Sequence, residues 1–378
     1  MAEGKKGLEG AVAAQTKVSS IDGQRGVLAY VGYDILDLAE HSSFEEIVYL
    51  LHNYELPGRG ELQELHTTLA KERAPHEFLV NLSRSIASEM HPMSVLRTIV
   101  SAAQAHDPDG REYTDGANLR KSYRLVAQVP QLVAIDHRIR SGLEIPAPRE
   151  DLNIAGNFLW TLLGSEPDPA MVADLDVILV LYADHTLNAS TFAARVAAAT
   201  LADIHAAVTA AVATLQGPLH GGAIEEAKTM LDQIGAPERA ERWVKDRLAN
   251  KQKIMGFGHR VYKTWDPRAT VLRGIAERVT TAAGNRALFE TAERVQETVI
   301  AEKGLYPNVD FYTGTIYAAM GIPSDLFTCM FAVSRVAGWT AHIREQYADN
   351  RLIRPSSEYI GPGPRRWVPV DQRDHHGA

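Results

Sequence analysis

Apolar residues recur at spacings of three and four positions along most of the chain, with prolines and glycines between the runs. This spacing places apolar side chains on one face of a helix, so it predicts a mainly α-helical protein. In the first half of the chain the predicted helices cover residues 61–73, 75–88, 92–105, 117–139 and 153–163. The run 117–139 keeps its period through Pro130, which should kink the helix because proline lacks an amide donor.

Residues 16–33 are the one stretch that favours β-strands. Strand-forming residues flank Asp22-Gly23, a dipeptide typical of tight turns, which predicts a small hairpin before the helices. Ser43 and Glu46 then fit a capping box, in which each side chain accepts a hydrogen bond from the other residue's backbone amide. A helix should therefore begin at residue 44.

Two alanine-rich apolar runs, 169–182 and 190–215, predict closely packed helices at the centre of the protein or at a subunit contact. The polar stretch 183–191 interrupts them and has little reason to lie in a plain core. More amphipathic helices are expected at 224–234, 237–249, 267–283 and 287–303. Ser324 is expected to cap a long returning helix that ends near residue 349.

This pattern predicts two helical domains. Residues 1–221 plus 326–378 would form the larger one, which carries the dimer contacts, and residues 222–325 a smaller inserted one. After residue 350, prolines and glycines predict an extended tail that lies over a neighbouring subunit. His375 and His376 end this tail, and we expect them to be disordered rather than to bind a metal.

Composition limits the possible functions. The chain has 378 residues, 45% of them hydrophobic, and a formal net charge of −8, which argues against nucleic acid as the main partner. Cys329 is the single cysteine, so no internal disulfide can form and a reducing compartment is favoured. No run approaches the roughly 20 apolar residues of a membrane span, and the N-terminus lacks an apolar signal segment. We expect a cytoplasmic protein that neither enters a membrane nor binds nucleic acid.

Two histidines are set beside glycines. His220 lies in Gly-Pro-Leu-His-Gly-Gly and His259 in Gly-Phe-Gly-His-Arg, where the main chain can approach a ligand closely. Asp310 supplies a carboxylate just before another apolar helix. An aspartate in this place is commonly a helix N-cap, and His259 could equally cap the loop before it. Together, however, two imidazoles and one acid favour acid–base chemistry at carbon.

Three segments carry a resemblance to a known family. GPLHGGA, GFGHRVYKTWDPR and PNVDFYTG resemble the catalytic segments of citrate synthases and of the related 2-methylcitrate synthases, and the resemblance runs nearly the whole length. It implies the two-domain helical fold of that family with a small N-terminal β-hairpin. By the same resemblance Asp310 is the base, His220 hydrogen-bonds the thioester oxygen, and His259 polarises the ketone of oxaloacetate and protonates the forming alkoxide.

A dicarboxylic substrate requires cations, and a guanidinium matches a carboxylate well. By resemblance Arg268, Arg335 and Arg354 clamp the substrate, Arg354 reaching in from the second subunit of a homodimer. His185 matches a further substrate-binding position, although Thr186 stands where many members of the family carry another residue. The resemblance also implies a set of coenzyme A contacts: Ile254, Met255, Gly256, Gly258, Lys303 and Asn308.

The resulting prediction is an acyltransferase that condenses acetyl-CoA with oxaloacetate to give citrate and CoA. No metal or redox cofactor is expected, because the thioester acidifies its own α-carbon. An alternative is a 2-methylcitrate synthase that uses propionyl-CoA, since one methylene is worth only about 1–3 kcal/mol of discrimination. Two further hypotheses are a two-histidine, one-carboxylate iron site made of His220, His259 and Asp310, and a non-catalytic helical scaffold.

Overall fold

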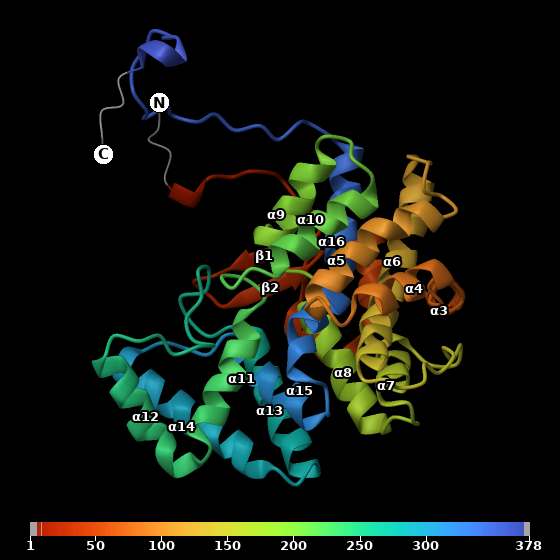
Figure 1. The fold of residues 1–378 in the computed structure, drawn as a ribbon. Coiled ribbons are helices and arrows are strands. Elements are labelled where there is room, and N and C mark those ends of the chain that lie inside the picture. Colours follow the sequence, from red (N-terminus) through yellow and green to blue (C-terminus); the bar gives the residue numbers. More distant parts are fainter. Residues whose placement is uncertain (1–5, 9, 374–378) are drawn as a thin grey trace.

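The computed structural model describes residues 6–8 and 10–373, and His375 and His376 lie outside them. Within this part of the chain the protein is mainly α-helical, as predicted (Figure 1). The α-helices are α1 (Ile35–His41), α2 (Phe44–Asn53), α3 (Arg59–Glu72), α4 (Glu77–Ile86), α5 (Pro92–Ala103), α6 (Asp115–Arg140), α7 (Ile154–Leu163), α8 (Pro169–Tyr182), α9 (Ala189–Ala198), α10 (Ile204–Leu215), α11 (Ala223–Ile234), α12 (Pro237–Ala249), α13 (Pro267–Ala282), α14 (Arg286–Lys303), α15 (Val309–Ala319) and α16 (Phe327–Ala348). Short 3-10 turns occur at Lys6–Leu8, Gln104–His106, Ser324–Leu326 and Val370–Gln372.

The predicted hairpin is present. Strands β1 (Ser19–Asp22) and β2 (Val27–Tyr30) pair antiparallel, and the two residues of β3 (Tyr33–Asp34) add a third strand. Asp22 stabilises the turn because its Oδ1 accepts hydrogen bonds from the amides of Gln24 and Arg25, each at 3.0 Å. The capping box before α2 is also confirmed, with Ser43 and Glu46 bonded to each other's backbone.

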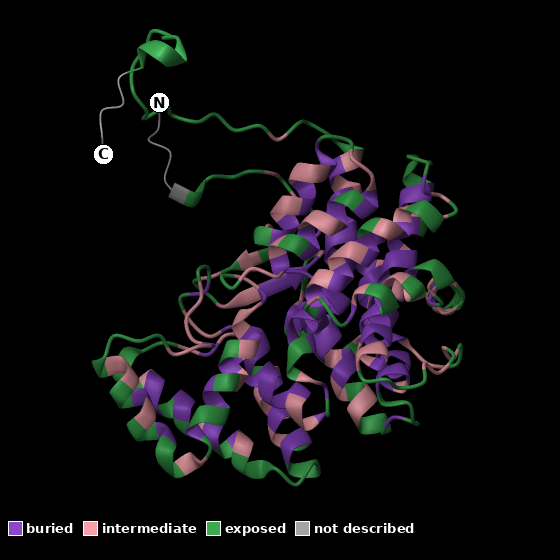
Figure 2. Ribbon diagram, in the orientation of Figure 1, coloured by how far each residue is buried: buried purple, intermediate pink, exposed green. Residues whose placement is uncertain are grey.

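Helix α16 is the centre of the larger helical body. It is buried along nearly its whole length and packs against α6, α9, α10, α8 and α2 (Figure 2). Trp339 and Arg335 on this helix are both buried, although one is apolar and the other charged. A guanidinium inside a helical core requires a polar environment, so this part of the core also borders a site.

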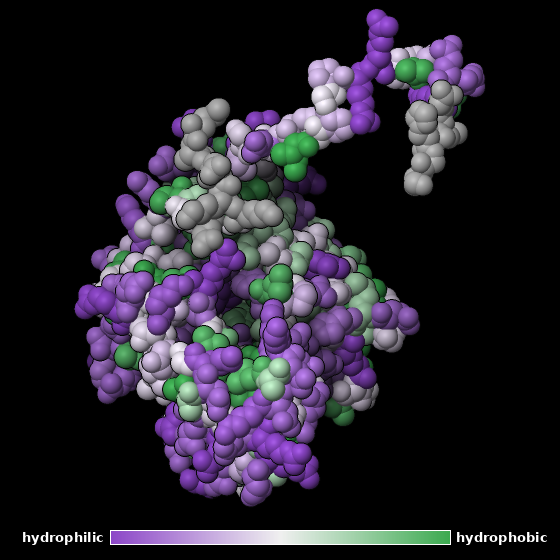
Figure 3. Space-filling view, turned by 90° about the vertical axis from the view of Figure 1, so that its left-hand side faces the viewer, coloured by the Kyte–Doolittle hydropathy of each residue, from purple (hydrophilic) through white to green (hydrophobic). Residues whose placement is uncertain are grey.

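Helices α11 to α15 pack mainly on one another and occupy the lower part of Figure 1. Contacts of α13 with α1 and α8 join them to the larger body. The space-filling view of the side nearest α12 is mainly hydrophilic in its lower part, consistent with amphipathic helices at the surface (Figure 3). The division into domains 1–221 plus 326–378 and 222–325 stays a prediction.

Two sequence predictions are wrong in detail. Residues 190–215 form two helices rather than one, because Leu201 adopts a positive φ of 65° and Asp203 caps a new helix by accepting from the Ala206 amide at 3.0 Å. Ser324 does not cap the long returning helix, since it lies in a 3-10 turn and makes no side-chain cap bond there.

Helix α6 continues through Pro130 without ending, as its apolar period predicted.

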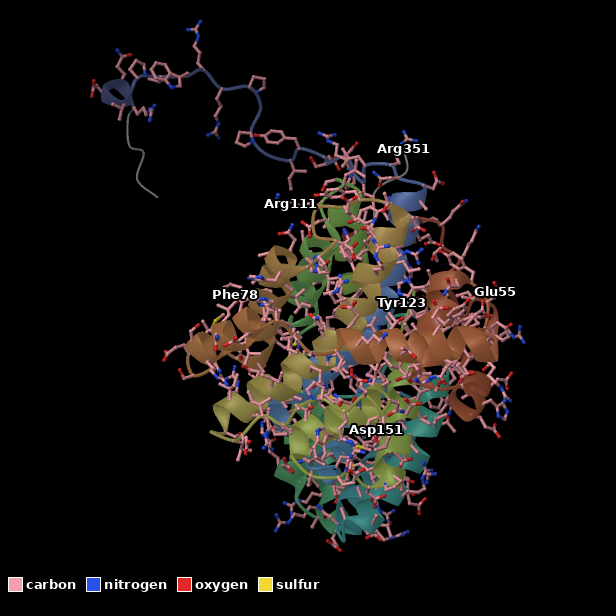
Figure 4. The ribbon with its side chains drawn as sticks, turned by 90° about the vertical axis from the view of Figure 1, so that its right-hand side faces the viewer. Glu55, Phe78, Arg111, Tyr123, Asp151 and Arg351 are labelled. Atoms are coloured by element: carbon pink, nitrogen blue, oxygen red, sulfur yellow. The ribbon has the colours of Figure 1, made fainter. Side chains whose placement is uncertain are left out.

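The C-terminal tail is extended and exposed beyond α16 (Figure 2). Arg351 marks the place where it leaves the helical body (Figure 4). Tyr359, Ile360 and Trp367 on this tail are each at least three-quarters exposed. Among the residues that the structure describes, no helix is both long and apolar enough to cross a membrane.

Candidate active site

A cleft of about 850 Å³ brings together most of the predicted site residues. It lies between the N-terminal segment before β1, the stretch after α8 with the start of α9, the turn before α11, the loop before α13, the start of α15 and the first half of α16. The predicted residues that line it are His185, His220, His259, Arg268, Asn308, Asp310 and Arg335. Segments more than a hundred residues apart in the sequence therefore meet at one place.

His259 is held in one neutral form by its own loop. Its Nδ1 accepts hydrogen bonds from the backbone amides of Val261 at 3.0 Å and Tyr262 at 3.1 Å. Because Nδ1 is an acceptor, the ring proton lies on Nε2. Burial, with the positive charge of Arg268 as a second cause, lowers the pKa of His259 to about 4. His259 is therefore neutral at pH 7 and carries an N–H that it can donate.

The contacts of His220 favour the opposite tautomer. Its Nε2 accepts from the Ser190 amide at 3.4 Å, which leaves the ring proton on Nδ1. The same Nε2 lies 2.8 Å from Ser190 Oγ, which also contacts Asn188 Oδ1 at 2.7 Å. Burial and then the charge of Arg335 lower the pKa of His220 to about 4. Trp339 Nε1 donates to the same Ser190 hydroxyl at 3.1 Å, so the partner of His220 is itself held.

Asp310 lies in the first turn of α15, but it does not cap the helix. Asn308 is the cap, and its Oδ1 accepts from the Asp310 amide at 3.0 Å. The carboxyl of Asp310 is left free, and its Oδ1 is buried without a hydrogen-bond partner among the described residues. Burial raises the pKa of Asp310 to about 7, although Arg268 and Arg335 oppose this shift. Such a carboxylate is a stronger base than an exposed one.

Two buried guanidinium groups supply positive charge. Arg268 is paired with Asp266, whose Oδ2 it contacts at 2.8 Å, and this carboxylate raises the pKa of Arg268 even though burial opposes it. Burial lowers the pKa of Arg335. Neighbouring His185 has a buried Nε2 without a partner among the described residues, and burial holds its pKa well below the usual range. These groups can receive the oxygens of an anionic substrate.

The remaining predicted contacts lie away from this cleft. Arg354 is exposed on the C-terminal tail, and Lys303 is exposed at the end of α14. Met255 faces a separate groove between α11 and α12. Ile254, Gly256 and Gly258 are not among the residues that line the cleft. The coenzyme A contacts therefore stay predictions.

The loop at residues 254–258 is nevertheless bonded to the segment that carries Asp310. The Asn308 amide donates to Gly256 O at 2.9 Å, and Asn308 Nδ2 donates to Gly258 O at 3.0 Å. Gly256 has a φ of 79°, and a Cβ at this position would lie 2.8 Å from the Cβ of Phe311. Only glycine fits there without strain, since both the conformation and the contact exclude a side chain.

The sequence predictions missed three residues that hydrogen-bond the site residues or the segments that carry them. Ser190 and Trp339 fix His220, and Tyr182 bonds the start of α15. The polar stretch 183–191 was the available signal for Ser190. Tyr182 and Trp339 gave no signal in the sequence. Tyr182 ends one apolar helical run and Trp339 lies within another, and both positions are typical of ordinary core residues.

The iron hypothesis finds no support in this geometry. Among residues 6–8 and 10–373, no three His, Cys, Asp or Glu side chains are grouped so that they could hold one metal ion. The two histidines also present neutral N–H groups rather than a shared ligand set.

The fold and the cleft together define a helical acid–base enzyme with cations for an anionic substrate. Comparison with known proteins makes the assignment specific: the family model for "Citrate synthase, C-terminal domain" matches residues 7–356. The chain therefore belongs to the citrate synthase family.

Several named relatives cover nearly the whole chain. Citrate synthase 2 of Bacillus subtilis is 50% identical over 369 residues, which is 97% of this chain and 99% of the relative. The 2-methylcitrate synthase of Mycobacterium tuberculosis is 42% identical, covering 94% of this chain and 90% of the relative. The crystal structure of citrate synthase from Pyrobaculum aerophilum superposes with a TM-score of 0.92 at 40% identity, covering 97% of this chain and 95% of that one.

A solved complex is also similar. Citrate synthase from Thermoplasma acidophilum, in a ternary complex with carboxymethyl coenzyme A and oxaloacetate, matches with a TM-score of 0.92 at 34% identity. The match covers 97% of this chain and 99% of that one.

Replacing Asp310 with Asn should stabilise the protein at neutral pH. A carboxyl whose pKa is raised by folding destabilises the folded state when it is charged, and this cost is absent below about pH 4 and complete above about pH 7. We expect Asp310→Asn to raise the free energy of unfolding by on the order of 3 kcal/mol at pH 8 and to leave it unchanged at pH 4. Thermal or urea unfolding at both pH values measures this.

The control is Asp246→Asn, which neutralises an exposed carboxylate on α12. It should change stability at neither pH. An Asp310→Asn protein no more stable than wild type at pH 8 would contradict the burial cost assigned to Asp310.

Proposed function

We propose that this enzyme condenses acetyl-CoA with oxaloacetate and hydrolyses the resulting thioester, releasing citrate and CoA. The observation that carries the proposal is the convergence of a free carboxylate with a raised pKa and two neutral histidines of opposite tautomer on one cleft that also contains two buried arginines. Both histidines are neutral at pH 7, and Asp310 becomes fully deprotonated above that pH.

In the first step Asp310 removes a proton from the methyl group of the thioester. The Nδ1–H of His220 donates to the thioester oxygen, so negative charge that develops there is stabilised by a fixed dipole. No metal or redox cofactor is required in this proposal, since the thioester withdraws electrons from the carbon that loses the proton.

In the second step the nucleophilic carbon attacks the ketone carbon of oxaloacetate. The Nε2–H of His259 hydrogen-bonds the ketone oxygen and passes its proton to the forming alkoxide, and the ring then takes up a replacement proton from water. Arg268 and Arg335 hold the substrate carboxylates. Water then cleaves the thioester of citryl-CoA. Closure of the smaller domain over the cleft would exclude bulk water before this point.

The comparisons support these substrates. The ternary complex of the Thermoplasma acidophilum protein contains oxaloacetate and a coenzyme A analogue. The relative at 50% identity is named a citrate synthase, whereas the 2-methylcitrate synthases of Corynebacterium glutamicum are each 41% identical. Propionyl-CoA therefore remains the alternative thioester, with acetyl-CoA preferred.

We also propose a homodimer in which Arg354 of each subunit completes the site of the other. Its exposed position on an extended tail supports this, because within its own subunit Arg354 does not line the cleft. The proposed location is the cytoplasm, and the proposed process is the tricarboxylic acid cycle.

Release of CoA measured with a chromogenic disulfide tests the function directly. The assay combines oxaloacetate with either acetyl-CoA or propionyl-CoA, with EDTA present throughout. We expect oxaloacetate-dependent release and a higher kcat/KM for acetyl-CoA. A higher value for propionyl-CoA would assign the alternative activity, and release with neither thioester would refute the proposed function.

The pH profile should report Asp310. Because the base must be deprotonated and its pKa is about 7, kcat/KM for acetyl-CoA should fall about tenfold per pH unit below pH 7 and level off above it. No step is expected near pH 6.5 from His220 or His259, since both are already neutral.

Asp310→Asn should lose on the order of 10³-fold in kcat while still binding oxaloacetate in calorimetry.

Mixed dimers test the role of Arg354 across the interface. Arg354→Ala and His220→Ala subunits should each be nearly inactive alone. After co-refolding, one site of each mixed dimer would contain both intact residues, so roughly a quarter of the wild-type activity should return. No recovery, with mixed dimers verified by mass, would place Arg354 in the site of its own subunit or outside any site.

A further inference from the structure

Tyr182 is the last residue of α8 and lies directly behind the cleft. It is 1% exposed, and its ring packs edge-on against Phe331 at a centroid distance of 4.4 Å. Phe331 in turn lines the cleft. The tyrosine thus ends an apolar helix with a polar group that points toward a different helix.

The hydroxyl of Tyr182 contacts the first turn of α15. It donates to the carbonyl oxygen of Val309 at 3.0 Å and lies 2.7 Å from Thr313 Oγ1, which also donates to Val309 O at 2.7 Å. This carbonyl belongs to the same planar peptide unit as the amide of Asp310. That amide donates to Asn308 Oδ1 at 3.0 Å.

Side chains therefore hold the peptide unit before Asp310 at both of its ends. Fixing the oxygen and the N–H of one planar peptide unit fixes the orientation of that unit. It thereby restricts the direction of the Cα–Cβ bond of Asp310. Asn308 belongs to the segment of Asp310 itself, whereas Tyr182 comes from the larger helical body. The tyrosine sets the position of the carboxylate relative to that body.

The main chain of Tyr182 has a second partner. Its carbonyl oxygen accepts a hydrogen bond from Arg335 Nε at 2.7 Å. With Nε occupied there, the other nitrogens of this guanidinium remain available at the cleft that Arg335 lines. One residue therefore contacts both the segment of the carboxylate and one of the buried cations.

We propose that Tyr182 is a positioning residue that places the carboxylate of Asp310 for proton removal from the thioester substrate. The proposal rests on the proposed function, which makes Asp310 the base. An aromatic ring alone would fill the same space, but it would leave the peptide unit before Asp310 bound only from within its own segment. The hydroxyl is the group that acts.

Tyr182→Phe removes this hydroxyl and keeps the ring and the carbonyl contact with Arg335. Because a carboxylate misplaced by a fraction of an ångström loses reactivity, kcat should fall about tenfold. The KM for oxaloacetate should stay within about twofold of wild type, since the arginine contact is retained. The isotope effect on kcat with methyl-deuterated acetyl-CoA should rise, because proton removal becomes more nearly rate-limiting.

The matched control is Tyr317→Phe, the same chemical change at another buried tyrosine of α15, whose ring packs near Phe327 at 5.6 Å. It should change neither kcat nor the isotope effect. If Tyr182→Phe does not unfold cooperatively, Thr313→Val provides a second test. This variant removes the other side-chain hydroxyl that donates to Val309 O, and it should raise the isotope effect in a folded protein.

The outcomes separate the two proposals. A wild-type enzyme that turns over acetyl-CoA, with Tyr182→Phe unchanged in kcat and isotope effect, overturns the role of Tyr182 alone. A Tyr182→Phe enzyme whose kcat falls while its isotope effect stays at the wild-type value also overturns the role of Tyr182. A wild-type protein without oxaloacetate-dependent release of CoA removes the proposed function and, with it, this inference.

Discussion

The half-buried carboxyl group of Asp310, whose Oδ1 is buried without a partner among the described residues, is the constraint on which the arrangement of the cleft depends. A charged carboxylate without a hydrogen-bond partner is costly inside a protein, so a stable fold must hold Asp310 in place by other means. The structure does so through the backbone: Asn308 takes the helix cap, and Tyr182 and Thr313 bind the carbonyl before Asp310. The carboxyl itself remains free for a substrate.

Burial and the charges of two arginines set the protonation states of the titratable groups in the cleft. Arg268 and Arg335 stay charged while the nearby histidines are neutral, because burial and the arginine charges act in the same direction on an imidazole. On Asp310 burial and the arginines act in opposite directions, and burial prevails. The cleft can thus keep cations for an anion, two neutral proton donors and a base side by side at neutral pH.

Much of this could be predicted from the sequence, because the signals are local. The hairpin, most helix limits and the two glycine-flanked histidines depend on neighbouring residues, and the segments GPLHGGA and GFGHRVYKTWDPR indicated the roles proposed for these histidines. The helix break at Leu201 was missed because alanine-rich periodicity continues across it. Ser324 was assigned a cap from its residue type alone, whereas capping depends on the path of the chain. Tyr182 could not be found, since its partner lies 127 residues away.

The bonds between the 254–258 loop and Asn308 have a consequence for altering this enzyme. Because Gly256 packs directly on Phe311 and its carbonyl accepts from the Asn308 amide, the loop and the segment that carries the carboxylate form one bonded unit. A substitution in this loop would therefore also displace the carboxylate of Asp310. Selectivity is better redesigned at Phe192 on α9, which lines the cleft and lies outside this unit, than at Phe331, which packs against Tyr182. The side chain open to redesign and the carboxylate are thus on different helices, α9 and α15.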